Sequence, residues 1–529
     1  MKPLLSPLSS CASCRRRILT TFGLTLPKRP YTRPSIAPKP TLDIKHIRQA
    51  PGLYEQNCII RNHRAQSKNP WRIKELYDQI TQSRRAATEL RTRRNEINEL
   101  LKSAEGDAKP ALLKEAKELK GKDASFVENE AKWEREAQDL AEALPNLSST
   151  STPVGERAEV IGEINEQHPV ITERSRLAGT TSHIDIGAEL DILDFTSASK
   201  TTGWGWYYLK TEAALLEQAL INYSLQVAME RGWKIVSPPS MVYEHIAYAC
   251  GFQPRDQNGE QQIYAIQQSK KDAGKPKLVL AGTAEIPLAA MKANQTMEES
   301  ELPLKLIGVN RCYRAEAGAR GINTKGLYRV HEFTKVEMFA WTLPDENSDA
   351  HNGTGAAFAE IHTPHAEVIF DEMLSIQTHI LKSLGLHCRI LEMPTTDLGA
   401  SASRKKDIEA FFPSRSLKNE GYGEVTSASI CTDYQTRRLG TRFKSKSGKI
   451  DFPCTVNGTA MAVPRVLAAI LENGWDEGER RVEIPEVLRP WMGGRTFIEG
   501  KKIVKGEEVT KESIKGDERE DIQREHTLS

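Results

Sequence analysis

The segment CYRAEAGARGINTKGLYRVHEFTKVE, residues 312–337, places charged and aromatic residues at alternate positions on either side of a glycine-containing loop. Because successive side chains of a strand point to opposite faces, Phe333 and Lys335 share one face of the second arm. The planar guanidinium of Arg314 can bind two phosphate oxygens at once, and the ring of Phe333 can stack on a base. The spacing predicts an antiparallel β-hairpin that holds a small anionic ligand. A surface hairpin closed by a cross-strand salt bridge would show the same alternation, so this segment alone leaves both possibilities open.

The two common phosphate-binding loops are missing from the sequence. No stretch matches GxxxxGK[ST], and no GxGxxG follows a predicted strand. A nucleotide would therefore have to bind through separate arginine and aromatic side chains, as the hairpin offers, and not through a glycine-rich loop at the start of a helix.

The segments around the hairpin predict an antiparallel sheet with helices packed against it. Residues 209–231 have helical periodicity, and residues 345–364, rich in Asn, Gly, His and Thr, are typical of a surface insertion. Several strand-like runs are joined by hairpins and not by crossover helices, which favours antiparallel pairing. The runs lie at residues 233–236, 277–280, 305–310, 328–341, 386–391, 423–430 and 454–457.

Two segments with heptad periodicity precede this sheet. The first begins at Ile73 and the second ends at Leu144, and in both the apolar residues recur at spacings of three and four. The connector 104–110 contains a glycine and Pro110, so we expect the helices to fold back as an antiparallel arm over residues 72–144. Periodicity alone favours a dimerisation coiled coil or part of a helical bundle. Four arginines indicate phosphate contact instead, although acidic neighbours weaken that signal: Arg84, Arg85, Arg91 and Arg93.

Length and charge exclude some classes of function. A chain of 529 residues with 39% hydrophobic content can bury a large core and carry a second domain. The formal net charge is only +2, so contact with a nucleic acid must come from local basic patches. No apolar run reaches the roughly 18 residues that span a bilayer, and no membrane association is expected.

The N-terminal residues and the cysteines indicate a compartment. The first 42 residues contain no Asp or Glu but are rich in Arg, Lys, Ser, Thr and Pro, which predicts a disordered mitochondrial transit peptide over residues 1–40. An ordinary disordered basic tail is the alternative. Among eight cysteines the one close pair, Cys11 and Cys14, has no second pair to complete a zinc site, so we expect reduced thiols and no structural zinc.

Five motifs in the same order resemble those of the seryl-tRNA synthetase family of class II aminoacyl-tRNA synthetases, over residues 42–492. In motif 3, Ala460 and Pro464 replace glycines that many family members have, so the start of its helix is expected to be stiffer. The similar segments are GWGWYYLKTEAALLEQAL to GWKIVSPPSMV at 203–242 (motif 1, with Pro239), GTAEIPL from Gly282, RAE at 314–316 with RVHEFTKVEMF at 329–339 (motif 2), GEVTSASICTDYQTRR from Gly423, and TVNGTAMAVPRVLAAILEN at 455–473 (motif 3, with Arg465).

The resemblance implies an ATP site with three catalytic residues. Arg314 would hold the α-phosphate and Arg465 the γ-phosphate, while Glu424 with Ser427 would bind Mg²⁺ through oxygen atoms, the ligands that this hard cation prefers. Phe333 would stack on adenine. The complete set of implied ATP contacts is Arg314, Ala315, Glu316, Val330, His331, Glu332, Phe333, Glu424, Val425, Thr426, Ser427 and Arg465.

The resemblance also implies a pocket for serine beside the nucleotide. Thr283 and Glu285 lie two positions apart, so an extended segment directs both side chains to one ligand, the amino group of serine. A pocket that hydrogen-bonds a hydroxyl rejects alanine, because its buried partners would stay unpaired. The implied serine contacts are Thr283, Ala284, Glu285, Arg314, Glu337, Asn457 and Thr459.

The fold implied is α+β, a class II antiparallel β-sheet flanked by helices and preceded by a two-helix coiled-coil arm. The implied parts are a leader (1–40), a tRNA-binding domain (41–150), a catalytic domain (151–492) and a charged tail (493–529). The implied activity is that of a homodimeric serine–tRNA ligase of the mitochondrial matrix, which uses ATP, Mg²⁺ and L-serine and grips tRNA(Ser) with the arm. The alternative is a catalytically inactive paralogue that acts as an RNA-binding or interaction protein.

Overall fold

The computed structural model describes residues 34–103, 105, 108–167, 181–252, 262–272, 274–315, 326–344, 364–415 and 419–500. The chain divides into two compact units, Met1–Ala37 and Pro38–Ser529, and the account below concerns the second. Most of the expected leader, nearly all of the expected insertion at 345–364, the tail from residue 501 and the site residue Glu316 lie outside the described residues.

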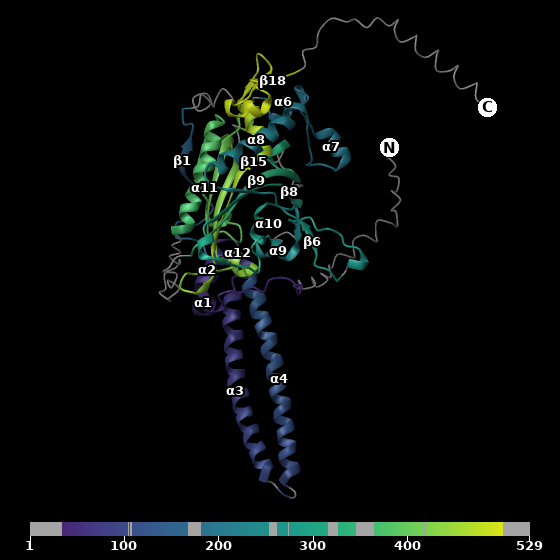
Figure 1. Ribbon diagram of the computed structural model, residues 1–529, viewed down its shortest axis with the longest axis vertical. Coiled ribbons are helices and arrows are strands. Elements are labelled where there is room, and N and C mark those ends of the chain that lie inside the picture. Colours follow the sequence, from purple (N-terminus) through teal and green to yellow (C-terminus); the bar gives the residue numbers. More distant parts are fainter. Residues whose placement is uncertain are drawn as a thin grey trace, which may run out of the picture. The chain divides into compact units, whose positions relative to one another are not determined.

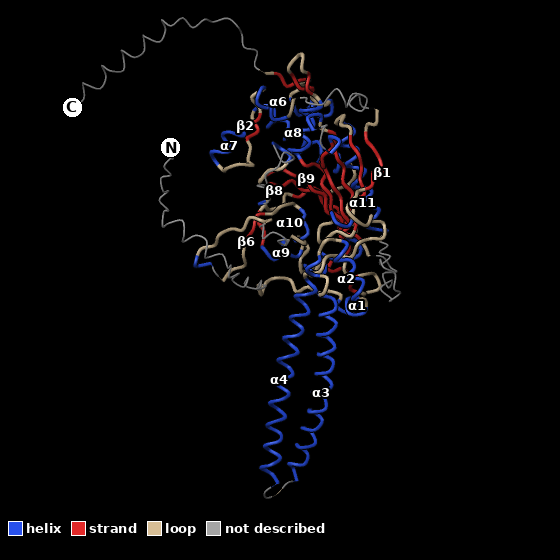
Figure 2. Tube along the Cα trace, turned by 180° about the vertical axis from the view of Figure 1, so that it is seen from behind, coloured by secondary structure: helices blue, strands red, loops and turns tan. Residues whose placement is uncertain are grey.

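An eight-stranded sheet forms the centre of the protein (Figures 1 and 2). Neighbouring strands pair antiparallel except β4 and β8, which pair parallel, and this confirms the predicted antiparallel sheet. The predicted hairpin at 312–337 is the β8–β9 pair. In spatial order the strands are β1 (Glu159–Ile164), β10 (Cys388–Glu392), β11 (Arg404–Phe411), β12 (Tyr422–Thr432), β15 (Cys454–Ala462), β9 (Glu332–Thr342), β8 (Leu304–Tyr313) and β4 (Lys234–Val236).

Strand β11 was not predicted, because charged residues interrupt its apolar pattern. The sheet accommodates these charges by pairing them with residues of its own strands. Arg404 donates to both carboxylate oxygens of Glu392 on β10 at 2.9 Å, and Lys405 lies 2.7 Å from the Asp407 carboxylate. A sequence pattern shows the charges but not these partners.

Three helices cover one face of the sheet and enclose the main core. They are α8 (Thr211–Met229), which confirms the predicted helix at 209–231, α11 (Pro364–Ser383) and α13 (Val463–Asn473). Val336, Met338 and Ala340 of β9 are buried in this core. Because side chains alternate along a strand, residues 333, 335 and 337 point to the opposite face. That face carries the site described below.

Shorter elements complete the body. The helices are α1 (Ile44–Gln49), α2 (Pro51–Ile60), α6 (His183–Glu189), α7 (Phe195–Thr201), α9 (Glu244–Ala249), α10 (Glu285–Ala290) and α12 (Tyr434–Leu439). The small sheets are β14 (Ile450–Asp451) with β13 (Arg442–Lys444) and β7 (Thr296–Glu298), β16 (Trp475–Asp476) with β17 (Arg481–Glu483) and β18 (Phe497–Glu499), β2 (Leu193–Asp194) with β3 (Tyr208–Leu209), and β5 (Met241–Tyr243) with β6 (Leu278–Leu280). The run predicted at 277–280 is β6, so it lies outside the central sheet.

The predicted helical arm is present as α3 (Asn69–Ser103) and α4 (Ala108–Glu142), which run side by side in Figure 1. At about 1.5 Å per residue each helix is roughly 50 Å long. One expectation was wrong: Pro110 lies in the first turn of α4 and not in the connector. A helix tolerates proline there because the first backbone N–H groups have no partner within the helix. The predicted heptad positions face inward and are buried at Ile73, Leu76, Ile80, Ser83, Ala87 and Ile97.

Three of the four arm arginines singled out in the sequence are ion-paired across the hairpin. Arg84 lies 2.8 Å from Glu134, Arg91 3.0 Å from Asp123 and Arg93 3.0 Å from Glu115. Exposed pairs of this kind contribute at most about 1 kcal/mol each, so the apolar seam holds the helices together. The fourth arginine, Arg85, is exposed.

The serine- and threonine-rich segment after the arm packs tightly against the sheet and is not an exposed linker. Ser148, Ser149 and Thr152 are buried. The side-chain amide of Asn146 donates to the carbonyl oxygens of Ser401 at 2.8 Å and Cys431 at 2.9 Å. The base of the arm is therefore fixed to the C-terminal end of β12.

Candidate active site

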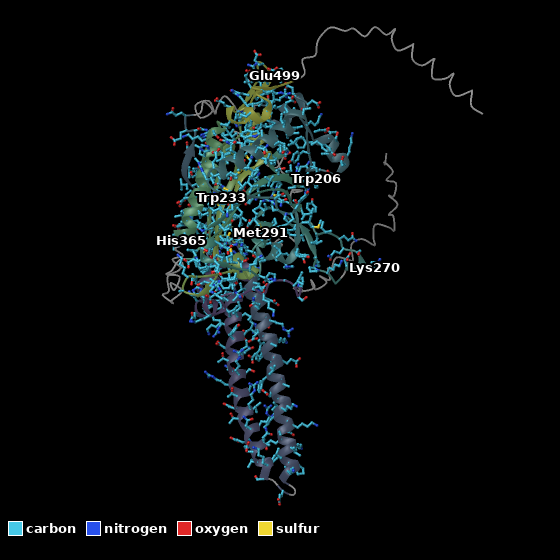
Figure 3. All side chains as sticks on the ribbon, viewed as in Figure 1. Trp206, Trp233, Lys270, Met291, His365 and Glu499 are labelled. Carbon is cyan, nitrogen blue, oxygen red and sulfur yellow. The ribbon has the colours of Figure 1, made fainter. Side chains whose placement is uncertain are left out.

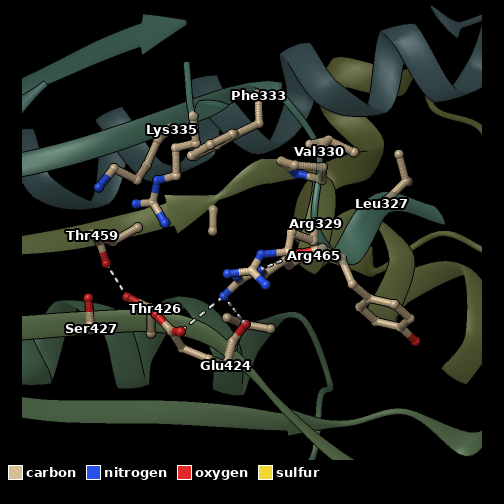
Figure 4. A pocket seen from close by; sticks show the side chains of 15 residues that line it. Leu327, Arg329, Val330, Phe333, Lys335, Glu424, Thr426, Ser427, Thr459 and Arg465 are labelled. Atoms are coloured by element: carbon tan, nitrogen blue, oxygen red, sulfur yellow. Dashed lines mark hydrogen bonds and ion pairs between the residues drawn. The ribbon is translucent and has the colours of Figure 1, made fainter. Parts of the chain in front are cut away.

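A cleft of about 240 Å³ opens on the face of the sheet that α8, α11 and α13 leave uncovered. In Figure 4, Phe333 and Lys335 of β9 lie opposite Glu424, Thr426 and Ser427 of β12, and Arg465 points between the two groups. The cleft is lined by Arg314, Leu327, Tyr328, Arg329, Val330, Phe333, Lys335, Glu424, Val425, Thr426, Ser427, Thr459, Ala462, Pro464 and Arg465.

The two arginines expected to bind phosphates both line this cleft. Arg314 follows β8, and its guanidinium carbon lies 5.2 Å from the centre of the Phe333 ring. Arg465 lies in the first turn of α13, where its Nε donates to the backbone carbonyl of Tyr328 at 3.0 Å and its Nη1 donates to that of Glu424 at 2.9 Å. Arg314, just after β8, and Arg465, on α13, thus bring two positive charges into one cleft, an arrangement that suits phosphate binding.

Glu424 and Ser427 lie three positions apart, so regular alternation would place them on opposite faces of β12. A bulge corrects this. The register with β11 skips Val425, since Thr426 pairs with Ile408 while Glu424 pairs with Glu409. One extra residue in a strand shifts the phase of the side chains that follow it. Both Glu424 and Ser427 therefore face the cleft.

Glu424 stays ionised despite the protein around it. Burial raises the pKa of this carboxyl group, but the neighbouring cations Arg465, Lys405 and Arg314 outweigh burial and lower the pKa to about 2. A carboxylate and a hydroxyl fit Mg²⁺, which usually takes only one or two protein ligands and completes its shell with water and phosphate oxygens. No group of three or more His, Cys, Asp or Glu side chains that could hold a metal by itself occurs among the described residues.

Three of the residues expected to bind serine are deeply buried beside the cleft. Thr283, Glu285 and Glu337 expose 1%, 6% and 1% of their surfaces. Lys335 lies 2.7 Å from the Glu337 carboxylate, and the hydroxyl of Thr459 donates to the same carboxylate at 3.3 Å. Since Lys335 and Thr459 also line the cleft, they join this pocket to it.

Glu285 has the most unusual ionisation in the pocket. Burial, followed by repulsion from Glu337, raises the pKa of its carboxyl group to about 8. The side-chain amide of Gln435 donates to it at 2.6 Å. Ala284 is fully buried immediately before α10, and Asn457 accepts a weak hydrogen bond from the thiol of Cys431 at 3.5 Å. A ligand with a cationic group would favour the ionised form of Glu285.

The other described residues among the expected ATP contacts, Ala315, His331 and Glu332, are not among the residues that line the cleft. Trp206, labelled in Figure 3, stacks on the ring of His331 with centroids 5.8 Å apart, and the hydroxyl of Tyr264 lies 2.8 Å from its Nδ1. Glu332 lies on the face of β9 opposite to Phe333 and is 3.8 Å from Arg311. Ala315 donates its backbone N–H to Gln262, and Glu316 lies outside the described residues.

Comparisons with known proteins agree with this geometry. Residues 41–148 match the seryl-tRNA synthetase N-terminal domain, and residues 264–474 match the class II tRNA synthetase core domain (G, H, P, S and T). The chain is 36% identical to the mitochondrial serine–tRNA ligase of Saccharomyces cerevisiae over 468 residues, which cover 87% of this chain and 96% of the relative. The chain belongs to the seryl-tRNA synthetase family.

Other members of the family support the same assignment. The mitochondrial serine–tRNA ligase of Schizosaccharomyces pombe is 37% identical, over 85% of this chain and 88% of the relative. The crystal structure of seryl-tRNA synthetase from Pyrococcus horikoshii complexed with ATP superposes with a TM-score of 0.73 at 28% identity, covering 87% of this chain and all of that one. The expected class II fold is therefore confirmed.

Two departures from the family's motif 3 fit the structure without strain. Pro464 lies in the first turn of α13, where a proline costs no hydrogen bond. Ala460 is buried in the main core. The glycines that many seryl-tRNA synthetases have at these positions are not needed for this backbone, and Pro464 stiffens the helix start that carries Arg465.

Several cleft residues of this seryl-tRNA synthetase family member were not assigned a role from the sequence. Lys335 could have been found, because it shares a strand face with Phe333. Arg329 adds a further positive charge to those of Arg314, Lys335 and Arg465 in the cleft. A role for Tyr328 could not be predicted from the sequence, because its hydrogen bonds join it to residues more than 130 positions away.

Proposed function

We propose that this chain is a serine–tRNA ligase, which activates L-serine with ATP and transfers the seryl group to tRNA(Ser). The observation that carries the proposal is the convergence of Arg314, Arg465, Glu424 and Ser427 on one cleft, beside the buried carboxylates of Glu285 and Glu337. Identity to serine–tRNA ligases over nearly their full lengths supports the same conclusion.

In the first step a carboxylate oxygen of serine attacks the α-phosphorus of ATP, the bond to the β-phosphate oxygen breaks, and pyrophosphate leaves. Serine's carboxylate is already ionised at neutral pH, so the step needs no general base. Catalysis then consists of alignment and charge stabilisation. Arg314 holds the α-phosphate while negative charge spreads over it, and Arg465 holds the γ-phosphate end.

Mg²⁺ bound by Glu424 and Ser427 would neutralise phosphate charge and polarise the phosphoryl oxygens. Glu424 suits this role because its lowered pKa keeps it ionised throughout the physiological range. Phe333 offers a flat apolar face for adenine beside Arg314. Val330, Val425 and Thr426 border the same space.

Recognition of serine follows from the buried polar groups. The ammonium group of serine would lie near Thr283 and Glu285, and its positive charge would drive Glu285 to release a proton despite a pKa of about 8. The hydroxyl of serine would join the existing contact between Glu337 and Thr459, with Asn457 close by on β15. Alanine would lack the hydrogen bond between the serine hydroxyl and the Glu337 carboxylate, at a cost of about 1.5–3 kcal/mol.

In the second step a hydroxyl of the terminal ribose of tRNA attacks the carbonyl carbon of seryl-adenylate and AMP leaves. We propose that α3 and α4 grip the long variable arm of tRNA(Ser) through its shape and phosphates. Arg85 is available for such a contact because it is exposed, while Arg84, Arg91 and Arg93 already have partners.

We further propose that the enzyme is a homodimer that acts in the mitochondrial matrix, with residues 1–40 as its leader, 41–150 as tRNA-binding domain, 151–492 as catalytic domain and 493–529 as a charged tail. The acid-free N-terminal sequence and the mitochondrial relatives support the location. No described helix has the length and apolar character to cross a bilayer.

The test is serine-dependent exchange of labelled pyrophosphate into ATP, run in parallel with nineteen other amino acids, followed by charging of tRNA(Ser). Exchange with serine alone and charging of tRNA(Ser) are expected. A folded sample that exchanges with no amino acid, or with a different one, would overturn the proposal.

A further inference from the structure

A buried cluster behind the cleft connects four segments that are far apart in the sequence. Its centre is Glu472, in the last turn of α13, which exposes 6% of its surface. Its Oε1 lies 2.8 Å from Nδ1 of His183 and also accepts the His183 backbone N–H at 3.1 Å. The hydroxyl of Tyr328 donates to Oε1 at 3.0 Å, and the backbone N–H of Ser414 donates to Oε2 at 3.2 Å.

The carboxylate is ionised at this site. Burial raises its pKa, but the hydrogen bonds that it accepts from His183 and Ser414 outweigh burial and lower it. A buried charge that accepts bonds from three separate segments fixes those segments relative to one another, because any movement would leave a buried group unpaired.

His183 extends this cluster to the end of the motif 2 loop. Its Nε2 accepts the backbone N–H of Leu327 at 3.1 Å, so the ring must carry its proton on Nδ1, facing Glu472. The imidazole lies directly against Gly326, where an added Cβ would meet Nε2 at 2.2 Å. Gly326 also has a φ of +66°, which glycine adopts without strain. Because residue 326 is a glycine, the imidazole can pack against it and bind the backbone of the short helix η7 (Gly326–Tyr328).

Tyr328 connects this cluster to Arg465, the arginine expected to bind the γ-phosphate. While its hydroxyl donates to Glu472, its backbone carbonyl accepts from Nε of Arg465 at 3.0 Å. Arg465 and Glu472 are seven positions apart, two turns on the same side of α13. One residue therefore binds both ends of the helix that carries the expected γ-phosphate ligand.

We propose that His183 and Glu472 are positioning residues for serine activation: they hold Tyr328 so that its carbonyl orients the Arg465 guanidinium toward the nucleotide. The proposal rests on the proposed function for its reaction but not for its geometry. It predicts that disturbing Glu472 weakens ATP binding and leaves serine binding unchanged, although Glu472 lines neither the cleft nor the serine pocket.

The main test is Glu472→Gln, whose amide nitrogen would face the N–H of Ser414 and lose that bond. We expect the KM for ATP in pyrophosphate exchange, and the dissociation constant of ATP by calorimetry, to rise about tenfold, as for loss of one hydrogen bond to a charged group. The KM for serine should stay within twofold. The matched control is Glu217→Gln. Glu217 is a buried glutamate on α8, away from the cleft, and it accepts a hydrogen bond of 2.6 Å from the hydroxyl of Thr334. This variant should lower the melting temperature without changing ATP binding.

Two variants of His183 test separately the two hydrogen bonds that its imidazole ring makes, one to Glu472 and one to Leu327. His183→Asn keeps a donor near the Nδ1 position for Glu472, and His183→Gln keeps an acceptor near the Nε2 position for Leu327. Both should raise the KM for ATP, and neither should change that for serine. If Glu472→Gln does not fold, Tyr328→Phe removes a single hydroxyl and should raise the KM for ATP about threefold.

A double-mutant cycle decides between positioning and mere stability. In an Arg465→Ala background, Glu472→Gln should change the dissociation constant of ATP less than twofold, because the residue that it positions is gone. Additive losses, or an unchanged ATP affinity with a lowered melting temperature, would overturn the inference. Absence of serine-dependent exchange in the wild type would instead contradict the proposed function, while ATP calorimetry would still test the positioning.

Discussion

The guanidinium of Arg465 lies 3.1 Å from the carboxylate of Glu424. The two groups come from α13 and β12, and each neutralises the other. In the proposed reaction Arg465 would bind a phosphate in place of Glu424, and Glu424 would bind Mg²⁺ in place of Arg465. The pair therefore holds the charged groups ready without leaving either unpaired in the cleft, and removal of either should affect the other.

Removing the carboxylate should raise the requirement for Mg²⁺. We expect Glu424→Gln to need at least tenfold more Mg²⁺ for half-maximal pyrophosphate exchange, because one of the two proposed protein ligands to the cation loses its charge. The measurement is a Mg²⁺ titration after chelation with EDTA. Glu409→Gln is the matched control, since Glu409 lies beside Glu424 on β11 but pairs with Arg389 at 2.7 Å. Equal Mg²⁺ curves for wild type and Glu424→Gln would exclude the metal role.

Replacing the arginine at the α-phosphate should slow the chemical step. Arg314→Lys keeps the charge but loses the planar fork, and we expect kcat for exchange to fall about 100-fold, close to the ~3 kcal/mol seen when one preorganised donor is removed. Arg311→Lys is the control, because Arg311 lies on β8 close before Arg314 but its guanidinium lies 3.6 Å from the Glu217 carboxylate. Wild-type turnover in Arg314→Lys would contradict the assigned role.

The hydroxyl of Thr459 should set selection for serine. Thr459→Ala removes the donor to Glu337, so we expect the KM for serine to rise at least tenfold while the KM for ATP changes little. Thr459→Ser retains the hydroxyl and should stay within a few-fold of the wild type. The two variants are compared by serine titration of exchange, and an equal loss in both would indicate a packing effect instead.

The raised pKa of Glu285 predicts how stability depends on pH. An ordinary glutamate titrates near 4.5, whereas the folded protein holds this proton up to about pH 8. The stabilising contribution is therefore complete below about pH 4.5 and is lost as the pH rises through 8. Relative to Glu285→Gln, the free energy of unfolding of the wild type should fall by up to ~1.4 kcal/mol per pH unit in this window.

Urea unfolding of the wild type and Glu285→Gln at several pH values between 5 and 8.5 measures this difference. Asp407, whose burial raises its pKa to about 7, is present in both proteins, so its contribution cancels. Parallel stability profiles of the two proteins would mean that Glu285 is ionised in the folded state at neutral pH.

The outer part of the arm should serve tRNA charging alone. Its base must stay, because Ile73, Leu76, Ala137 and Ala141 form a buried cluster with the N-terminal helices. We therefore expect replacement of residues 85–129 by a short glycine linker to leave pyrophosphate exchange within twofold and to reduce tRNA(Ser) charging at least 100-fold. Arg85→Glu should raise the KM for tRNA, and equal loss of both activities in the deletion would mean that the arm is structural.

Local sequence determined a large part of this protein. Heptad spacing was enough to predict α3 and α4, since burial along a helix follows from its period of 3.6 residues. Alternation along 333–337 correctly placed Phe333 and Lys335 on one face, and applied strictly it also places Glu332 on the other. Arg314 and Arg465, far apart in the sequence, were recognised through family motifs and lie in one cleft.

Tertiary structure decided what depends on partners distant in the chain. The bulge at Val425 comes from the register between β11 and β12, and without it Glu424 and Ser427 would face opposite sides. Strand β11 escaped prediction because charges interrupt its apolar pattern, and the partner of Arg404, Glu392 on β10, is brought near only by the folded sheet. The raised pKa of Glu285 and the hydrogen bond between Glu472 and Tyr328 also depend on tertiary structure. Burial and nearby charges are set by the residues that surround a side chain in space, and not by its neighbours in the sequence.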